Sequence, residues 1–318
     1  NKNRLIFVLI IFFLISNFGS FFQAQFIYDP FHWGLVAQSA IDFLKKDLLP
    51  YKDFFIHYGF LSTLTQSLVM FIFDSDTIYL LYTSSIFFTL GNLMVCFVAK
   101  KYLKLSSVIF ICILIFLLHP FANHPWYNYQ FYFLLVLSLF FLSKRTNLGI
   151  FLFGFILSLT SLVYENFFYL SLITLFLQIL LNNFYKDKRI MICIIGFILP
   201  LFFFHFYLLI FSLHEFWFKT FTLNNAFFEI YNLNFFELII KYLKTLISKN
   251  LFTQTYFYIF FSIFIFNLYI CSHFFLRKLK KKNFSNKENL IFFFSILSLL
   301  LFFTSIHITI FFSFLPCS

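Results

Sequence analysis

The stretch IMICIIGFILPLFFFHFYLLIFSL, residues 190–213, contains no Asp, Glu, Lys or Arg. A helix that crosses a bilayer needs about 20 mostly apolar residues, so this stretch predicts a transmembrane helix. Eight other runs have the same character, although several are shorter. The predicted spans are 5–22, 77–99, 105–119, 127–142, 148–163, 167–181, 190–213, 251–276 and 289–313. The sequence therefore predicts an all-α, polytopic integral membrane protein with about nine transmembrane helices, in a single transmembrane domain over residues 1–318.

The composition supports lipid as the main solvent of the chain. Hydrophobic residues make up 62% of the sequence and charged residues 11%, whereas soluble domains carry roughly 25% charged residues. The net charge of +11 does not indicate a nucleic-acid partner, because the basic residues form short clusters between apolar runs. Such clusters mark the cytoplasmic side of a membrane protein, and they predict contact with membrane lipids.

The charged residues also predict the orientation of the chain. With a cytoplasmic N-terminus, most of the 23 basic residues fall in short inner segments, whereas of the acidic residues only Asp187 and Glu288 do so. This asymmetry is typical of cytoplasmic loops. We therefore expect a multi-pass protein of the cell inner (cytoplasmic) membrane, with residues 5–22 as a signal-anchor helix.

Two long segments are predicted on the outer side. They are the first outer (periplasmic) loop, residues 23–76, and a second segment, residues 214–250. Apolar residues recur with helical spacing in 31–46 and 235–248, which predicts helices lying in the membrane interface. The apolar stretch 60–73 is too short to span and is expected at the outer surface.

The first outer loop contains most of the polar residues that could carry chemistry. Asp29 precedes Pro30, so it is a candidate N-cap of the next helix and, alternatively, a general base at the membrane boundary. His32 would lie within reach of Asp29 on that helix. Asp53 and His57 are four residues apart and would share a helical face.

Two further charged residues have both a structural and a functional interpretation. Lys52 could hold a phosphate as a point charge, or it could be a solvated surface lysine. Glu165 interrupts an apolar stretch, which makes it a functional candidate by default. The predicted topology places Glu165 at an outer turn between two helices, where water lowers the cost of the charge.

The first outer loop resembles that of the GT-C superfamily of membrane glycosyltransferases, which includes protein O-mannosyltransferases and aminoarabinose transferases. The close resemblance covers about residues 23–104, and beyond it only the alternation of helices and loops agrees. The matching residues are Asp29, His32-Trp33-Gly34, Pro50-Tyr51-Lys52-Asp53-Phe54-Phe55 and His57-Tyr58-Gly59-Phe60-Leu61. Many members have an acidic pair at the first position, whereas Asp29 is followed by Pro30 here.

This resemblance implies a function and a set of site residues. It implies inverting transfer of a sugar from a polyprenyl-phosphate donor to an acceptor hydroxyl on the outer face, with Asp29 as the base. The acceptor would be a lipid, a glycan or a protein. Substrate binding would then fall to residues of the first outer loop together with the outer-turn glutamate: His32, Lys52, Asp53, His57, Tyr58 and Glu165.

The sequence leaves alternatives for the cofactor and for the class of function. No nucleotide-binding motif and no Cys/His spacing typical of zinc is found, so no cofactor is predicted, although Asp29 and Asp53 could share a divalent ion. A transporter or flippase is the first alternative function. It would place charged groups at mid-membrane and often has internal repeats. A non-catalytic membrane scaffold is the second.

Overall fold

The computed structural model describes residues 2–24, 30–45, 48–54, 56, 58–74, 76–101, 103–118, 125, 127–164, 167–184, 187–219, 265–266, 268–277, 288–289 and 292. Within these ranges the chain is helical and forms no β-strand; Pro50 and Phe54 make an isolated bridge. The helices are α1 (Lys2–Ala24), α2 (Pro30–Lys45), α3 (Phe60–Ile72), α4 (Ile78–Lys100), α5 (Leu105–Leu118), α6 (Tyr127–Leu142), α7 (Asn147–Ser161), α8 (Phe167–Leu181) and α9 (Arg189–Ile210).

These helices lie where the apolar runs predicted them. The first seven predicted spans coincide within a few residues with α1 and α4–α9, and the stretches 31–46 and 60–73 form α2 and α3. The helix predicted at 235–248 lies outside the described residues. So do most of the spans predicted at 251–276 and 289–313. The all-helical fold class is therefore confirmed for the described chain.

The helices differ in whether they are long enough to cross a membrane. By length and composition, α4 and α9 are each able to cross a bilayer. The apolar helices α6, α7 and α8 have 15 or 16 residues and α5 has 14. At 1.5 Å per residue these helices are about 21–24 Å long, shorter than the roughly 30 Å hydrocarbon core.

The chain forms two compact units. The first comprises residues 1–175 and 184–221, and the second residues 176–183 and 222–318. Because the boundary falls within α8, only the first half of that helix belongs to the first unit. In the second unit Asn289 donates a hydrogen bond to the carbonyl of Leu181 at 2.9 Å. A single transmembrane domain stays a prediction.

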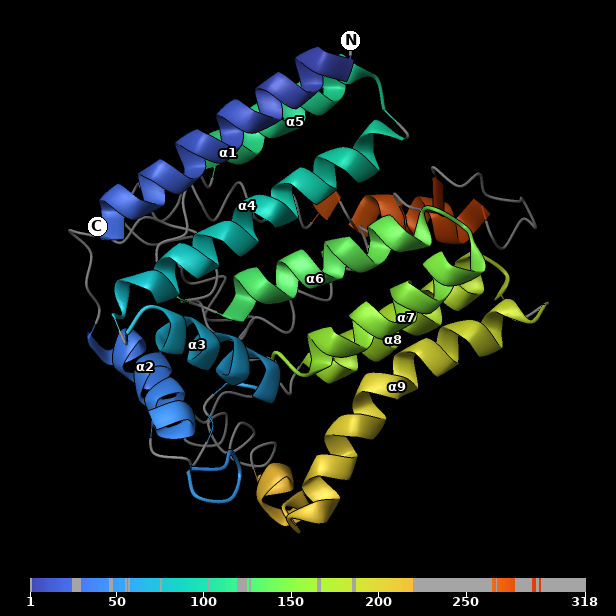
Figure 1. Ribbon diagram of the computed structural model, residues 1–318. Helices are drawn as coiled ribbons and strands as arrows, with labels where there is room; N and C mark the ends of the chain where they lie inside the picture. The colour runs from blue at the N-terminus through green and yellow to red at the C-terminus, as the bar shows by residue number, and fades with distance from the viewer. Residues whose placement is uncertain are drawn as a thin grey trace, which may run out of the picture. The chain divides into compact units, whose positions relative to one another are not determined.

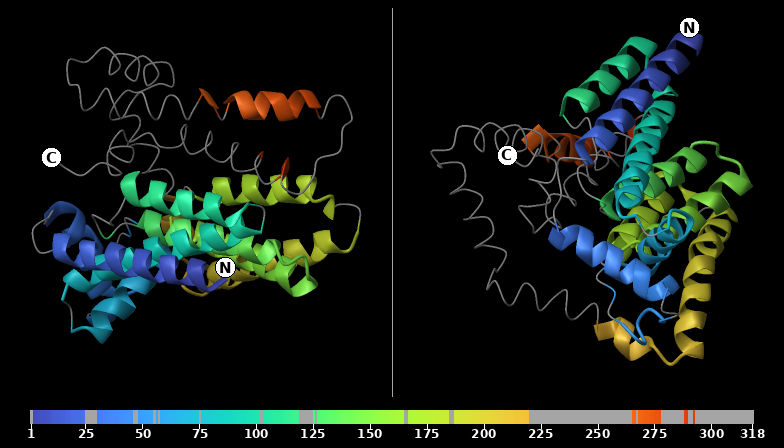
Figure 2. Two further views of the ribbon diagram at one scale, coloured as in Figure 1. Left: turned by 90° about the horizontal axis from the view of Figure 1, so that it is seen from above. Right: turned by 60° about the vertical axis from the view of Figure 1, so that its left-hand side comes forward.

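The helices of the first unit form a row. Within it α1 contacts α4 and α5, α4 contacts α6, α6 contacts α7, and α7 contacts α9. Figure 1 shows this row with α2 and α3 together at one end of α4. The views in Figure 2 show the same neighbours. The two short helices therefore lie where α1 ends and α4 begins.

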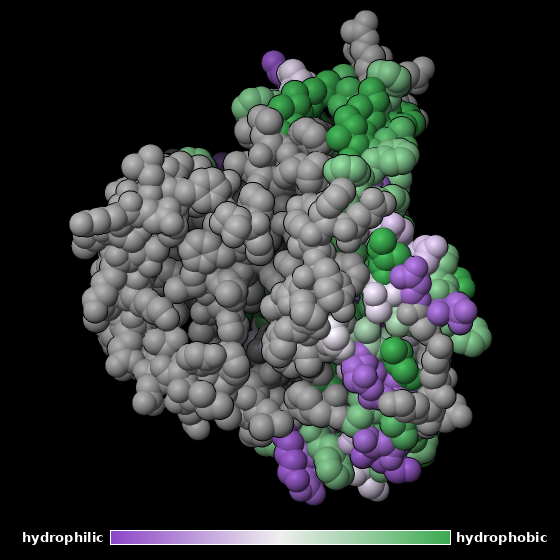
Figure 3. Space-filling model, turned by 90° about the vertical axis from the view of Figure 1, so that its left-hand side faces the viewer, coloured by the Kyte–Doolittle hydropathy of each residue, from purple (hydrophilic) through white to green (hydrophobic). Residues whose placement is uncertain are grey.

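Helix α1 turns its polar residues inward and its apolar residues outward. Ser16, Asn17 and Ser20 are buried, whereas Phe7, Phe18 and other large apolar side chains are exposed. Figure 3 shows hydrophobic residues gathered on the end of the molecule where α1 and α5 lie. A helix of a water-soluble protein has the opposite arrangement, with its apolar stripe facing the core. Helix α1 is therefore suited to an apolar solvent.

Hydrogen bonds between buried side chains join α1 to α4. The Asn17 amide donates to the hydroxyl of Thr89 at 3.1 Å, and the Ser85 hydroxyl donates to the Asn17 carbonyl oxygen at 3.0 Å. Asn17 also donates to the carbonyl of Phe13 at 2.8 Å. The buried polar side chains of Asn17, Ser85 and Thr89 thus satisfy one another between the two helices.

Glycines bring α7 and α9 together instead. A Cβ added to Gly154 would clash with the carbonyl oxygen of Cys193 and lie 2.9 Å from the nitrogen of Phe197. A Cβ added to Gly196 would clash with the carbonyl oxygen of Phe151. The two backbones approach so closely that no larger residue fits at either position.

Candidate functional site

The structure describes some of the predicted site residues and not others. Asp29, His57 and Glu165 lie outside the described residues, and so does the side chain of His32, whose backbone belongs to the start of α2. Helix α2 begins at Pro30, as the sequence predicted. The geometry of the site therefore depends on Lys52, Asp53, Tyr58 and the residues that flank the others.

Asp53 organises the turn to which it belongs. Its carboxylate accepts a hydrogen bond from the backbone nitrogen of Leu49 at 2.8 Å, and its own backbone nitrogen donates to the carbonyl of Leu49 at 2.9 Å. The side chains of Asp53 and Lys52 are both exposed. The predicted helical face shared by Asp53 and His57 is wrong, because the described residues between them are not helical. Local hydrogen bonding by the aspartate favours a turn instead.

The same turn is fixed to the end of α9. The Tyr207 hydroxyl donates to the carbonyl of Pro50 at 3.1 Å. The ring of Tyr51 packs edge-on against Phe204, with 6.1 Å between centroids. Tyr51 is buried even though its backbone is left-handed, at φ 66°. Burial of the aromatic ring compensates for the strain of that conformation.

The start of α3 is attached to the end of α7. The backbone nitrogen of Gly59 donates to the carbonyl of Val163 at 2.9 Å, and that of Leu61 donates to the carbonyl of Leu162 at 2.7 Å. A Cβ on Gly59 would lie 2.5 Å from the Leu162 oxygen. Glycine at this position therefore allows the close approach of the two backbones, which a side chain would prevent.

A group of three tyrosine rings connects the segments next to His57 and Glu165. The ring of Tyr127, at the start of α6, lies 4.5 Å from Tyr58 and 4.7 Å from Tyr164, centroid to centroid. Tyr58 directly follows His57, and Tyr164 directly precedes Glu165. Tyr127 thus brings the segment that follows His57 close to the segment that precedes Glu165, although the two are far apart in sequence.

Helix α2 joins the same assembly. Val36, Ala37 and Ala40 of α2 pack with Tyr58, and the ring of Tyr127 packs against this cluster. Helix α2 begins at Pro30, which directly follows Asp29 in the sequence. Within the segment predicted as the first outer loop, α2 and the start of α3 are therefore attached to the start of α6 and to the end of α7.

A small aromatic cavity lies beside the 48–54 turn. It is lined mainly by rings, and its residues are Tyr51, Phe60, Ser161, Leu162, Phe168, Leu201, Phe204, His205 and Trp217. His205 stacks parallel to His214, with 5.7 Å between centroids. Sequence reasoning did not select His205, although a lone histidine within the apolar stretch 190–213 was a usable signal.

The opposite ends of α4 and α6 carry basic residues. The Lys101 amine donates a hydrogen bond to the carbonyl of Ser143. Burial lowers the pKa of Lys101, and the neighbouring charges of Arg145 and Lys144 lower it further. Two basic segments that the sequence placed on one side of the membrane are thus adjacent in space.

Comparisons with known proteins add no relative. No family model, no curated protein and no solved structure matches this chain. Among the described residues, no three His, Cys, Asp or Glu side chains gather in a way that could hold a metal ion.

Proposed function

We propose that this chain is a multi-pass inner-membrane glycosyltransferase of the GT-C type. It transfers a sugar from a polyprenyl-phosphate donor to an acceptor hydroxyl on the outer face of the membrane. The single observation that carries this proposal is the attachment of the first outer loop to the ends of α6, α7 and α9. That attachment gathers the segments next to Asp29, His57 and Glu165 at one end of the first unit.

The membrane part of this proposal is supported by burial. Besides α1, helix α9 exposes large apolar side chains, among them Phe202, Phe203 and Leu209. Leaving so much apolar surface in water would be costly, at about 25 cal/mol per Å². We infer nine spans with a cytoplasmic N-terminus, and a periplasmic location for residues 23–76.

The proposed reaction transfers one proton to the base and releases one leaving group. The acceptor oxygen attacks the anomeric carbon and forms the new C–O bond with inversion, while the bond from that carbon to the phosphate oxygen breaks. The bonding electron pair leaves with polyprenyl phosphate, and the acceptor proton passes to the carboxylate of Asp29. Lys52, exposed on the 48–54 turn, is available to neutralise the departing phosphate.

The remaining site residues have binding roles in this proposal. Asp53 holds the turn that presents Lys52, and Tyr58 holds the segment after His57 against Tyr127. His32, His57 and Glu165 contribute polar contacts to donor or acceptor. The acceptor is a lipid, glycan or protein, and a divalent ion between Asp29 and Asp53 is an open part of the proposal.

The carboxylate of Asp29 gives the most direct test. Asp29→Asn should lower sugar transfer in membranes by about 10²- to 10⁴-fold, the usual contribution of a general base. The assay would measure release of polyprenyl phosphate from a panel of labelled polyprenyl-phosphate sugars. Asp74→Asn, the same substitution elsewhere in the outer loop, is the matched control and should retain activity. An active, folded Asp29→Asn variant would remove Asp29 from the assigned role.

The alternative functions predict other observations. A transporter or flippase places ionisable groups near mid-membrane. In the described parts of α1 and α4–α9, the Lys, Arg, Asp and Glu residues occur only at helix ends. Asn17 and Thr89 are buried polar residues, but they bond to each other and not toward a channel. Vesicle-based transport of a lipid-linked sugar without transfer would favour the transporter, and donor binding without turnover would favour the scaffold.

A further inference from the structure

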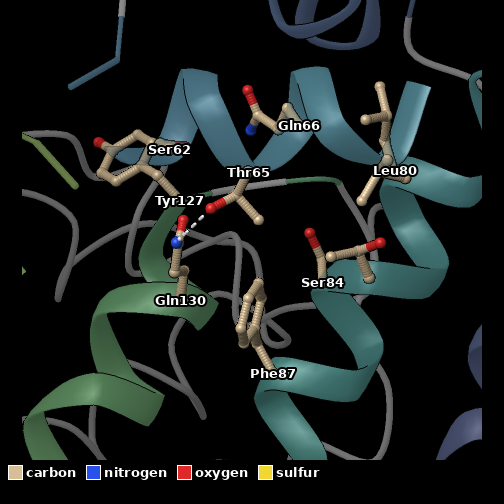
Figure 4. A pocket seen from close by; sticks show the side chains of 10 residues that line it. Ser62, Thr65, Gln66, Leu80, Ser84, Phe87, Tyr127 and Gln130 are labelled. Atoms are coloured by element: carbon tan, nitrogen blue, oxygen red, sulfur yellow. Dashed lines mark hydrogen bonds between the residues drawn. The ribbon is translucent and has the colours of Figure 1, made fainter. Parts of the chain in front are cut away.

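The two ends of the α4–α6 contact differ in character. At the end where α3 joins them, uncharged polar side chains of the three helices face one another, as Figure 4 shows. The space between them has room for about one water molecule, so this end is closed to larger ligands. Three cations, Lys101, Lys144 and Arg145, lie together at the opposite end, and we call them the basic cluster.

Tertiary structure assembles the basic cluster from two separate turns. Lys101 follows α4, whereas Lys144 and Arg145 follow α6 much later in the sequence. The Lys101 amine donates a hydrogen bond to the carbonyl of Ser143, which directly precedes Lys144. Figure 1 shows the end of α4 and the α6–α7 turn on the same side of the row. The two turns are therefore joined where the cations lie.

The cluster holds like charges close to one another. Burial lowers the pKa of Lys101, and the charges of Arg145 and Lys144 lower it further. The Lys144 ammonium lies 4.6 Å from the centroid of the Phe140 ring, which favours its position over that ring. The Ser143 carbonyl partners Lys101 but brings no net charge. Neighbouring positive charges disfavour one another, so an anion bound between them would be stabilised.

Acidic residues of the same side do not balance this charge. Residues 77–164, which include α4–α7, contain no Asp and no Glu. Of the two acidic residues predicted on the inner side, Asp187 pairs with Arg189 and Glu288 pairs with Arg277. Both are thus engaged by other arginines, and the inner turns after α4 and α6 keep a net positive charge.

Apolar surface next to the cluster favours a lipid as the source of that anion. Lys101 continues the helical conformation of α4, so Phe97, four residues earlier, lies on the same side of the helix. Phe97 is exposed, and so is Leu148, three residues after Arg145. Positive charge bordered by exposed apolar side chains matches a phospholipid, whose charged head group is joined to acyl chains. A water-borne polyanion would leave the apolar side chains uncovered.

We propose that the basic cluster binds the phosphodiester of an anionic phospholipid in the inner leaflet. The phosphate oxygens accept hydrogen bonds from Lys101, Lys144 and Arg145, and the acyl chains lie against the apolar surface beside them. Basic sites between transmembrane helices on the cytoplasmic side bind such head groups in other membrane proteins. The proposal rests on the membrane location and orientation inferred above, and it requires no transfer chemistry.

Native mass spectrometry of the full chain in detergent micelles measures this binding directly. Phosphatidylglycerol and phosphatidylcholine with identical acyl chains are compared, because only the first carries a net negative charge. Phosphatidylglycerol should bind more tightly. Lys144→Gln should weaken its binding about fivefold, and Lys144→Gln combined with Arg145→Gln about 20-fold, because each basic residue near a membrane surface contributes roughly that first factor. Both side chains are exposed, so these substitutions disturb no core.

Two control variants separate the cluster from general attraction to the membrane. Lys188 is an exposed lysine at the start of α9, predicted on the same side of the membrane. Lys188→Gln removes the same charge and should leave the affinity for phosphatidylglycerol unchanged. Lys144→Arg keeps the charge and should retain the affinity. If the double variant does not fold, the comparison of Lys144→Gln with Lys144→Arg decides.

Three outcomes would overturn the proposal. They are equal affinity for the two lipids, unchanged binding in the double variant, and equal weakening by Lys144→Gln and Lys188→Gln. The last outcome would show that attraction is spread over the inner side and is not focused on the basic cluster.

Competition with a soluble head group distinguishes a lipid from a free phosphate group. Glycerophosphoglycerol has the phosphodiester but no acyl chains, so it should displace phosphatidylglycerol only at a much higher concentration. Displacement at equal concentration would contradict the lipid assignment. Asp29→Asn should leave lipid binding unchanged. Failure of the transfer assay would therefore end the proposed function alone, and failure of the lipid assay would end this proposal alone.

Discussion

The α1–α4 and α7–α9 contacts use different means to hold two apolar helices together. Asn17, Ser85 and Thr89 join α1 to α4 by hydrogen bonds, whereas Gly154 and Gly196 let the α7 and α9 backbones touch. Lipid is as apolar as leucine, so burial of apolar surface adds little to helix association in a bilayer. Steric fit and hydrogen bonding remain as the driving forces, and this protein uses each at a separate contact.

Adding one methyl group at α7–α9 should break that contact and have the largest effect. Gly154→Ala places a Cβ against backbone atoms of Cys193 and Phe197, which cannot rotate away. We expect a destabilisation of about 1–3 kcal/mol, the usual cost of overpacking. The unfolding midpoint in an SDS titration of the protein in bicelles measures it.

The matched control for this substitution is Gly34→Ala. Gly34 lies in α2, and a Cβ there would meet nothing within 4 Å. The substitution should be neutral or stabilise by roughly 0.5–1 kcal/mol, because alanine favours a helix more than glycine does. Equal responses of the two variants would show that α7 and α9 are not in close contact.

Removing the hydrogen bonds at α1–α4 should have a smaller effect. Asn17→Leu keeps the branched shape of the side chain but deletes the bonds to Ser85 and Thr89. Bonds between transmembrane helices contribute about 0.6 kcal/mol on average and up to about 1.7, and a similar loss is expected here. A double-mutant cycle with Ser85→Ala isolates the pairwise energy.

Ser158→Ala is the control for that substitution. The Ser158 hydroxyl in α7 is buried without a partner, so its removal should cost nothing. A coupling energy near zero between Asn17 and Ser85 would mean that their bond is not formed in the bilayer. The two kinds of contact would then no longer be distinct.

The positions of the helices could be predicted from sequence, but their pairing could not. Apolar runs alone located α1 and α4–α9, because charged and polar residues fall mainly between these runs. Nothing in the spacing of Gly154 and Gly196 indicated that α7 pairs with α9. Helix pairing depends on shape complementarity between surfaces far apart in sequence, which a single sequence does not encode locally.

The sequence supplied candidate residues for a site but not the local geometry of the segment that carries them. The polar residues of the first outer loop stay a predicted site, and within it Asp53 forms a turn and not a helical face. Gly59 was noted only as part of the resemblance, whereas its contact with Leu162 is what attaches the loop to α7. His205 of α9 and Trp217, which follows α9 in the chain, both line the neighbouring cavity, and no local pattern indicated that they lie together.

An exposed ion pair is expected to contribute less to stability than either buried helix contact, so it can be compared with both. At the start of α9, the Arg189 backbone nitrogen and Nε each donate to Asp187 at 2.8 Å. The hydrogen bonds and charge of Arg189 lower the pKa of the Asp187 carboxyl from its usual value of 3.8. A depressed pKa in the folded state stabilises the protein above the unfolded pKa, and that contribution is lost as the pH falls through the folded value.

Asp187→Asn keeps an acceptor oxygen for the Arg189 backbone but removes the charge, so it should have the smallest effect of the three substitutions. The difference in unfolding midpoint between this variant and the unchanged protein should be fully present above about pH 3.8, the unfolded value, and should be lost as the pH falls below it through the lower folded pKa. High salt should also reduce it, because exposed charges are screened. The Asn17→Leu loss, which involves uncharged and buried groups, should persist at every pH and salt concentration. If it instead follows salt as the Asp187→Asn loss does, the α1–α4 contact is exposed to water, and the proposed burial of that contact in the bilayer is wrong.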